Sequence, residues 1–228
     1  ARLHDKFYLK ENRYKETKDS FKLLIKILKK KINKNKVYNI LDVGCANGEL
    51  TYNLEKNFKN FNISGTDVRQ DLLDKAKKNN SQKITFFKSD ISGKVSTKKK
   101  YDIIICAGVL AIFDDQKKIL NDLKKYLKKQ GQIYLFGNFN KYPYDVYIKY
   151  IDLKKNKNIF QSGWNVWSLL SIKKFFKSKK IEIKPFNIKK KINQKSDLVR
   201  SWTIKIKNKN HFTNGLSVVQ NQFWVRIY

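Results

Sequence analysis

The stretch from Asn39 to Leu50 is NILDVGCANGEL, and it constrains how the rest of the chain can fold. Its first half is apolar, as in a buried strand, and its second half holds two glycines, Gly44 and Gly48, around Cys-Ala-Asn. Glycine adopts positive φ at little steric cost, so Gly44 permits a sharp turn and Gly48 lets a helix begin close to a ligand. A strand that enters a glycine turn and then a helix is typical of a nucleotide-like ligand site.

The glycine spacing differs from that of a dinucleotide site. A dinucleotide fingerprint is GxGxxG, whereas Asp42, Gly44 and Gly48 give DxGxxxG. Cys45 and Ala46 stand where the middle glycine would be. A ligand without a pyrophosphate needs fewer glycines, so the loop favours a different ligand.

Strand-like and helix-like segments alternate along the first two thirds of the chain. The apolar periodicity predicts strands at residues 39–43, 62–66, 84–88, 102–106 and 132–139. It predicts helices at residues 49–57, 70–79 and 116–128, the last stopped by Gly131. This alternation implies an α/β fold with a parallel sheet covered by helices on both faces.

The two ends of the chain have a different character. Phe21, Leu24, Ile25, Leu28 and Ile32 fall at helical spacing and predict an amphipathic basic helix. Beyond residue 139 we expect a helix at 171–178, a strand at 180–187 and two or three antiparallel strands within 201–228. No repeat or Gly/Ser linker interrupts the chain, so we expect one domain. Its parts are an N-terminal helical cap (1–36), a ligand-binding core (37–139) and an insert with C-terminal strands (140–228).

VGCANGE at 43–49 resembles motif I of the class I S-adenosylmethionine-dependent methyltransferases, and further motifs follow in order. Asp67 matches the acid that binds both ribose hydroxyls, since a carboxylate accepts two hydrogen bonds from a cis-diol. Ser89-Asp90-Ile91 matches the adenine position, and YDIIICAGVLAIFDD at 101–115 resembles the fourth-strand motif. The resemblance implies a Rossmann-like, seven-stranded, mostly parallel sheet with antiparallel C-terminal strands.

The resemblance also implies the cofactor, S-adenosylmethionine, with S-adenosylhomocysteine as product. The residues that we expect to bind it are Arg13, Tyr14, Asp42, Gly44, Cys45, Asn47, Gly48, Asp67, Val68, Asp90, Ile91 and Ala107.

The base that would activate an acceptor hydroxyl is less defined. His211, in the predicted loop NKNHFTNG, is the candidate, with a solvent-facing histidine as the alternative. His4 is a weaker candidate. Asp114 and Asp115 follow the fourth strand and either contact substrate or cap the next helix.

Aromatic and polar residues after residue 139 suggest the acceptor site. The alternative for each aromatic residue is a place in the core. The chain start, SGWN and RSWT also give a softer resemblance to bacterial stand-alone methyltransferases associated with surface-polysaccharide (capsule) genes. That resemblance implies a small-molecule or glycan-precursor acceptor, possibly anionic. The residues that we expect to bind the acceptor are Tyr142, Trp164, Asn165, Arg200, Trp202 and Asn214.

The net charge of +32 has two interpretations. It suits an anionic partner, such as RNA, and an RNA methyltransferase is the alternative function. However, only five of the 51 basic residues are arginines, which are the better phosphate ligands, so a lysine-rich composition explains the surplus as well. The element Asn/Asp-Pro-Pro-aromatic, typical of adenine N-methyltransferases, is replaced by CAGV, and nucleic acid is the less favoured partner.

A third alternative is a non-catalytic S-adenosylmethionine-binding protein whose basic helix lies on a membrane. The longest apolar run, 103–113, is too short to span a bilayer, and no signal peptide is visible. Cys45 and Cys106 lack CxxC spacing, so we expect no metal site, no disulfide and a reducing, cytoplasmic location. The absence of Met indicates that the native chain starts elsewhere.

Overall fold

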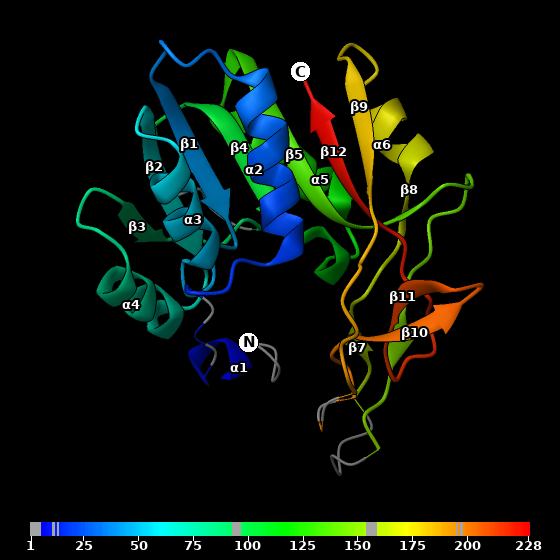
Figure 1. Ribbon diagram of the computed structural model, residues 1–228. Coiled ribbons are helices and arrows are strands. Elements are labelled where there is room, and N and C mark those ends of the chain that lie inside the picture. The colour runs from blue at the N-terminus through cyan, green and yellow to red at the C-terminus, as the bar shows by residue number, and fades with distance from the viewer. Residues whose placement is uncertain are drawn as a thin grey trace.

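The computed structural model describes residues 6–10, 12, 14–92, 97–153, 159–194, 196 and 198–228. One central sheet runs through the molecule, with helices on both of its faces and a smaller pair of strands beside it (Figure 1). None of the helices in the described ranges is long and apolar enough to cross a membrane.

The central sheet has the order β3-β2-β1-β4-β5-β12-β9, with β8 paired to the end of β5. Strands β3, β2, β1, β4 and β5 are mutually parallel, and β12 is antiparallel to both of its neighbours. The predicted seven-stranded, mostly parallel sheet is therefore confirmed, with β8 as an addition. The strands are β1 Tyr38–Val43, β2 Phe61–Asp67, β3 Thr85–Lys88, β4 Tyr101–Ala107, β5 Leu127–Asn140, β8 Trp167–Ser168, β9 Ile181–Phe186 and β12 Gln222–Ile227.

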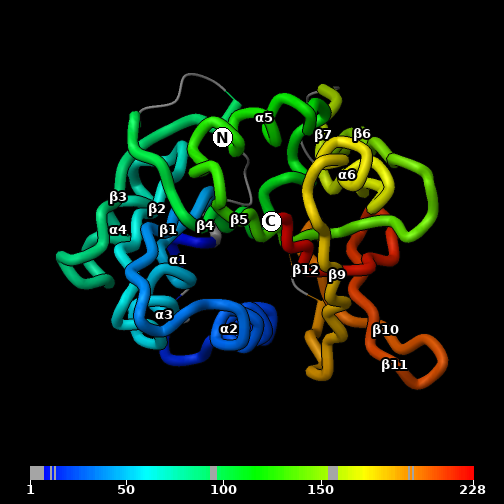
Figure 2. Tube along the Cα trace, turned by 90° about the horizontal axis from the view of Figure 1, so that it is seen from above, coloured from blue at the N-terminus to red at the C-terminus, as the bar shows by residue number. Residues whose placement is uncertain are grey.

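The core lies on both faces of this sheet because neighbouring strand residues point to opposite sides. Ile40 belongs to an apolar cluster that includes residues of α2, α3 and α4, whereas Leu41 belongs to a second cluster that includes residues of α5 and α6. Figure 2 shows these two sets of helices on opposite sides of the strands. The helices are α1 Lys6–Lys10, α2 Asp19–Lys31, α3 Glu49–Asn57, α4 Gln70–Asn79, α5 Gln116–Tyr126 and α6 Leu169–Phe175, with a short 3₁₀ helix at Leu110–Ile112.

Helix α2 belongs to the core. Leu24, Ile25 and Leu28 are buried against the sheet, and the Trp224 indole N–H donates to the Ser20 carbonyl at 3.0 Å. Its apolar face is therefore not available to a bilayer, which removes the observation that suggested a membrane-bound helix.

Several predicted boundaries were wrong, among them the start of β5, which lies at Leu127 rather than residue 132, and the end of α6, which lies at Phe175 rather than residue 178. Helix α5 ends at Tyr126 rather than residue 128, and Gly131 lies inside β5 instead of stopping the helix. The strand pairing moves from Tyr101↔Leu127 to Ile103↔Gln132, five residues on β5 for two on β4, which leaves three extra residues in a bulge. Helix α6 begins two residues before the predicted start, since the Ser168 hydroxyl caps it by accepting from the Leu170 N–H at 3.0 Å.

The last part of the chain forms separate small sheets as well as part of the large one. Two or three C-terminal strands were expected, and there are three in the described residues: β10 Trp202–Ile206 and β11 Lys209–Thr213 form a hairpin of their own, and β12 joins the central sheet. The insert contains a second hairpin, formed by β6 Lys149–Tyr150 and β7 Gln161–Ser162.

Leu28→Ala should lower the free energy of unfolding by about 2–5 kcal/mol, because it leaves a cavity between α2 and the sheet. Denaturant unfolding followed by circular dichroism measures this. Lys26→Ala, on the exposed side of the same helix, is the control and should change stability by less than about 0.5 kcal/mol. Equal stability of the two variants would mean that α2 does not pack on the sheet.

Candidate active site

Gly44 forms the turn at the end of β1, and only glycine fits there. Its φ is +68°, and a Cβ at this position would lie 2.3 Å from Val109 Cγ2. The N–H groups of Gly44 and Cys45 both donate to the Thr66 carbonyl, at 2.8 and 3.0 Å. The turn is thus fixed between the ends of β1, β2 and β4.

Gly48 is the N-cap residue immediately before helix α3 and has a φ of +82°. A Cβ there would lie 2.6 Å from Asn80 Nδ2 and 3.0 Å from the Ala76 Cβ. Glycine at this position therefore lets α3 pack against α4, and Gly48 is not among the residues that line the adjoining pocket.

A pocket opens at the carboxyl ends of the parallel strands, around the Gly44 turn. Nine of the twelve residues expected to bind the cofactor line it: Asp42, Gly44, Cys45, Asn47, Asp67, Val68, Asp90, Ile91 and Ala107. Gly48 and Tyr14 do not line it, and Arg13 lies outside the described residues, as does His4.

Asp67 is held in place at the end of β2. Its two carboxylate oxygens accept from the Ala46 N–H at 2.9 Å and from the Arg69 N–H at 3.0 Å. Asp90, by contrast, is exposed and accepts from the Ser92 N–H and hydroxyl at 2.8 and 2.7 Å. Both positions suit contacts to a ribose and an adenine, with Asp67 the more rigid of the two.

Asp42 is a buried acid in the wall of this pocket. Burial, reinforced by the negative charge of Asp67, raises the pKa of its carboxyl to about 8, and Lys18 opposes that shift. Among the described residues, its Oδ2 atom has no hydrogen-bond partner. A buried acceptor without a partner is costly, so this wall favours a ligand that brings a cationic or hydrogen-donating group.

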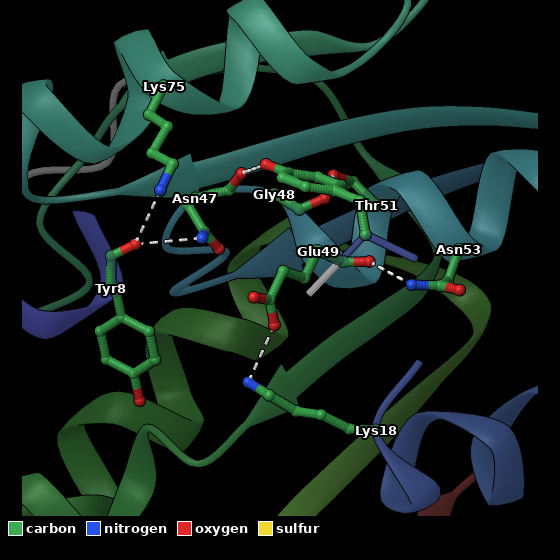
Figure 3. A network of polar contacts seen from close by, with 9 residues as sticks. Tyr8, Lys18, Asn47, Gly48, Glu49, Thr51, Asn53 and Lys75 are labelled. Carbon is green, nitrogen blue, oxygen red and sulfur yellow. Dashed lines mark hydrogen bonds and ion pairs between the residues drawn. The ribbon is translucent and has the colours of Figure 1, made fainter. Parts of the chain in front are cut away.

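A second buried acid, Glu49, faces the same pocket from the first turn of α3 and was not expected from the sequence. Lys18 Nζ lies 3.1 Å from its Oε2 (Figure 3). Its Oε1 has no hydrogen-bond partner within the described ranges. An acid in the first turn of a helix has an ordinary explanation in the helix dipole, so the sequence carried no signal that Glu49 and Lys18 meet here.

Residues before α2 close over the glycine turn. The Tyr8 carbonyl accepts from Asn47 Nδ2 at 3.1 Å and from Lys75 Nζ at 3.3 Å (Figure 3). The Tyr14 hydroxyl donates to the Asn47 carbonyl. Burial and the nearby Glu49 raise the pKa of Tyr14 to about 12, so it stays a neutral donor. Tyr14 therefore anchors the N-terminal segment.

A second pocket adjoins the first. The two share Tyr8, Lys18, Gly108 and Ile112 in their walls. Of the residues expected to bind the acceptor, Trp164 and Arg200 line this second pocket. Trp164 has a φ of +64°, a conformation that is uncommon for a bulky residue and is found mostly where the surrounding structure enforces it.

The other expected acceptor residues lie elsewhere. Asn165 is fully buried and holds the insert in place, because its Nδ2 donates to the Phe113 carbonyl and to Asp114 at 2.9 and 2.8 Å. Asn214 is buried in a turn, where its Oδ1 accepts from the Leu216 N–H at 3.1 Å. Tyr142 is exposed and, like Trp202, is absent from the walls of both pockets.

His211 also lies outside both pocket walls. It is part of β11, where the next residue, Phe212, lines the second pocket. Adjacent strand residues point to opposite faces, so the imidazole is directed away from the pocket. Asp115 caps α5 by accepting from the Lys118 N–H at 3.0 Å, as the capping alternative predicted.

The part of the chain that forms most of the first pocket is similar to known methyltransferases. Residues 34–146 match a family model described as a methyltransferase domain. The chain is 32% identical over 110 residues to malonyl-[acyl-carrier protein] O-methyltransferase 2 of Ilyobacter polytropus, covering 47% of this chain and 42% of that protein. The chain thus spans less than half the length of this relative.

Solved structures show the same fold across most of the chain. The YcgJ protein from Bacillus subtilis has a TM-score of 0.62 at 12% identity, covering 91% of this chain and 97% of that one. The magnesium protoporphyrin IX methyltransferase ChlM from Synechocystis, solved with bound S-adenosylhomocysteine, has a TM-score of 0.55 at 14% identity and covers 91% of this chain and 81% of that one.

Asp67→Ala should weaken the binding of S-adenosylhomocysteine by roughly 10- to 100-fold, since hydrogen bonds to a charged group contribute about 1.5–3 kcal/mol. Titration calorimetry measures the affinity, and thermal unfolding checks the fold. Asp74→Asn, an exposed carboxylate on α4, is the control and should bind as the unaltered chain does. Unchanged affinity of Asp67→Ala would remove Asp67 from the ribose site.

Binding of S-adenosylmethionine near neutral pH should release up to one proton. The pKa of the Asp42 carboxyl is about 8 without a ligand, and a cationic ligand beside it favours the ionised form. Calorimetry in buffers of different ionisation enthalpy counts the protons.

Asp42→Asn is the matched variant, because it has no carboxyl to ionise and should release no proton from this site.

The dependence of stability on pH follows from the same pKa shift. An acid with a raised folded pKa holds a proton that the unfolded chain loses, so the ligand-free chain should become less stable from about pH 4 to about pH 8. Equal proton release by both proteins would contradict this account.

Proposed function

Residues 34–146 match the model of a methyltransferase domain, and we propose that the chain transfers a methyl group from S-adenosylmethionine to an oxygen or nitrogen of a polar small molecule. The observation that carries the proposal is the pair of adjoining pockets with four shared wall residues. One pocket holds the cofactor residues, and the other offers a place for an acceptor beside it.

The residues of the first pocket fit the cofactor. Asp67 and Asp90 suit its ribose and adenine, while Asp42 and Glu49 supply buried acceptor atoms at a wall that also contains Lys18. We assign the Lys18–Glu49 pair to the cofactor's amino-acid end, because a lysine and a carboxylate side by side complement a zwitterion.

The bound cofactor supplies an electrophilic methyl group on a sulfonium. The chain's own contribution is alignment of the acceptor with that group in a site shielded from water, which can lower the barrier by up to roughly 7–11 kcal/mol. The shared wall residues Gly108 and Ile112 lie where the two pockets meet, so they help to define that alignment.

The acceptor pocket is built mostly from residues outside the matched domain. Among them are Trp164, Phe186, Lys190, Arg200 and Phe212. A relative that matches less than half of the chain does not share these residues in its match. The acceptor named for such a relative therefore gives no guide to this pocket. Its own chemistry combines aromatic faces, on which a sugar ring can stack, with cationic groups that can hold an anion.

We extend the proposal to a sugar or anionic precursor of a bacterial surface polysaccharide. The resemblance of the chain start, SGWN and RSWT to capsule-associated methyltransferases supports it, and so does the lining of aromatic and cationic residues. Two carboxylates, Glu16 and Asp19, line the same pocket and could accept the acceptor's proton. We place the reaction in the cytoplasm, where the free cysteines Cys45 and Cys106 stay reduced.

Incubation with methyl-labelled S-adenosylmethionine and an extract of the host cell should label small, nuclease-resistant species that are anionic or contain sugar. Separation by size and nuclease sensitivity measures this. Label in RNA would instead support the alternative, in which the net charge of +32 serves nucleic acid binding.

With the acceptor identified, Arg200→Gln should raise its KM by about tenfold while leaving cofactor affinity unchanged, because a charged contact to the acceptor is lost. Lys205→Gln, exposed on β10 and outside both pockets, is the control.

His211→Ala tests the remaining sequence-based candidate. We expect it to retain turnover, since its imidazole is directed away from the acceptor pocket. Loss of turnover with intact cofactor binding would restore His211 as the base.

For the preceding variant, Arg200→Gln, an unchanged KM for the acceptor would remove Arg200 from acceptor binding.

A further inference from the structure

The described residues that line the acceptor pocket include three cations, Lys18, Lys190 and Arg200. Lys18 is committed to a buried partner. Its Nζ lies 3.1 Å from Oε2 of Glu49, whose side chain is only 4% exposed. Separating these two groups would leave a buried carboxylate without its counter-ion, which is strongly unfavourable. Lys18 is therefore not available to an anionic group of the acceptor.

Lys190 has a partner of a different kind. Its Nζ lies 2.6 Å from Oε1 of Glu16, which lines the same pocket, and the Glu16 side chain is 76% exposed. A carboxylate this exposed is solvated by water when it leaves its partner, so the ion pair is weak and opens readily. Lys190 can therefore exchange Glu16 for another anion at little cost.

The course of the backbone directs the Lys190 side chain toward the pocket. Ile188, Lys190 and Ile192 line the pocket, whereas the residues between them do not. This alternation is that of an extended chain, in which successive side chains point to opposite sides. The two apolar neighbours thus fix which side of the segment faces the pocket, and Lys190 lies on that side.

Hydrogen bonds hold the same segment against the β10–β11 hairpin. The Lys189 carbonyl accepts from Asn210 Nδ2 at 2.9 Å. The Ile192 N–H donates to the Thr203 hydroxyl at 2.8 Å, and the Thr203 N–H donates to the Ile192 carbonyl at 3.0 Å. Lys190 lies between these two attachments, so its cationic group projects from a fixed point of the pocket wall.

Glu16 comes from a different segment, the one that precedes α2. The Tyr14 hydroxyl donates to the Asn47 carbonyl, and the Thr17 hydroxyl donates to Asn53 Oδ1. These bonds attach the segment to the glycine turn and to α3, next to the cofactor pocket. The Glu16–Lys190 ion pair therefore joins two separately held parts of the chain at the acceptor pocket.

We propose that Lys190 is the anion subsite of the acceptor pocket and that the Glu16 carboxylate occupies this subsite in the ligand-free chain. The inference rests on the proposed function of the pocket and restricts the acceptor to molecules with a phosphate or carboxylate group. Such a group replaces Glu16 at Lys190, while Trp164 and Phe186 contact the body of the acceptor. An uncharged acceptor gains nothing from Lys190 and leaves the ion pair closed.

The test is the reactivity of individual lysines toward a trace of acetic anhydride, read by mass spectrometry. The purified chain is labelled with and without inorganic phosphate, at constant ionic strength. Lys191 is the internal control, because it is exposed, adjacent in sequence and absent from the pocket wall. Phosphate should protect Lys190 and should leave Lys191 nearly unchanged.

Glu16→Gln removes the internal carboxylate. The hydrogen bond and the charge of Glu16 raise the pKa of Lys190, so this variant should make Lys190 more reactive. We expect an increase of roughly two- to fivefold, the range of an exposed ion pair. The phosphate concentration that halves the reactivity should fall by a similar factor, because phosphate no longer competes with Glu16.

Asp74→Asn is the matched control variant. It changes the net charge by the same amount at an exposed carboxylate on α4, outside both pocket walls. It should change neither the reactivity of Lys190 nor the phosphate concentration needed to protect it. Thermal unfolding verifies that each variant folds.

Two results would overturn the proposal. Equal protection of Lys190 and Lys191 by phosphate would mean that Lys190 is not an anion subsite. An unchanged phosphate requirement in Glu16→Gln would mean that Glu16 does not occupy that subsite. The assay contains neither cofactor nor acceptor, so these outcomes are separate from those that test methyl transfer.

Discussion

The contact between Gly44 and Val109 is the constraint on which the site depends. Val109 follows β4 and occupies the space that a Cβ on Gly44 would need, at 2.3 Å. The turns after β1 and β4 can therefore approach each other this closely because residue 44 has no side chain. The same turn directs the chain into α3, brings Ala46 to the carboxylate of Asp67 and opens the pocket between the strand ends.

The cofactor pocket contains two buried acids whose carboxylates are incompletely hydrogen-bonded. Asp42 and Glu49 are both buried, and each has a carboxylate oxygen without a hydrogen-bond partner in the described part of the chain. Burial raises the pKa of Asp42, while Lys18 offsets part of the cost at Glu49. Buried acceptor atoms without a partner lower the stability of the ligand-free fold. A bound cationic ligand would supply hydrogen-bond donors to them, so the same groups that destabilise the free protein favour binding.

The acceptor side is assembled from segments that are distant in the sequence. Tyr8 and Lys18 come from the N-terminal segment, Ile112 from the loop after β4, and Trp164 from the insert. Asn165 joins the last two, because its side chain and backbone bond to the 111–114 loop. These bonds fix the chain immediately after Trp164, which has a φ of +64° and lines the pocket.

The sequence by itself determined the strand–glycine–helix turn and the alternation of strands and helices. It also predicted twelve cofactor residues, of which nine line the pocket. These depend on local rules: the period of apolar residues, positive φ at glycine and the placement of an acid at a strand end. Only the tertiary structure decided that Lys18 meets Glu49, that Asn165 is a support, and that His211 is directed away from the acceptor pocket. Those facts depend on contacts between residues far apart in the chain and on which face of a strand turns inward, and no local pattern carries them.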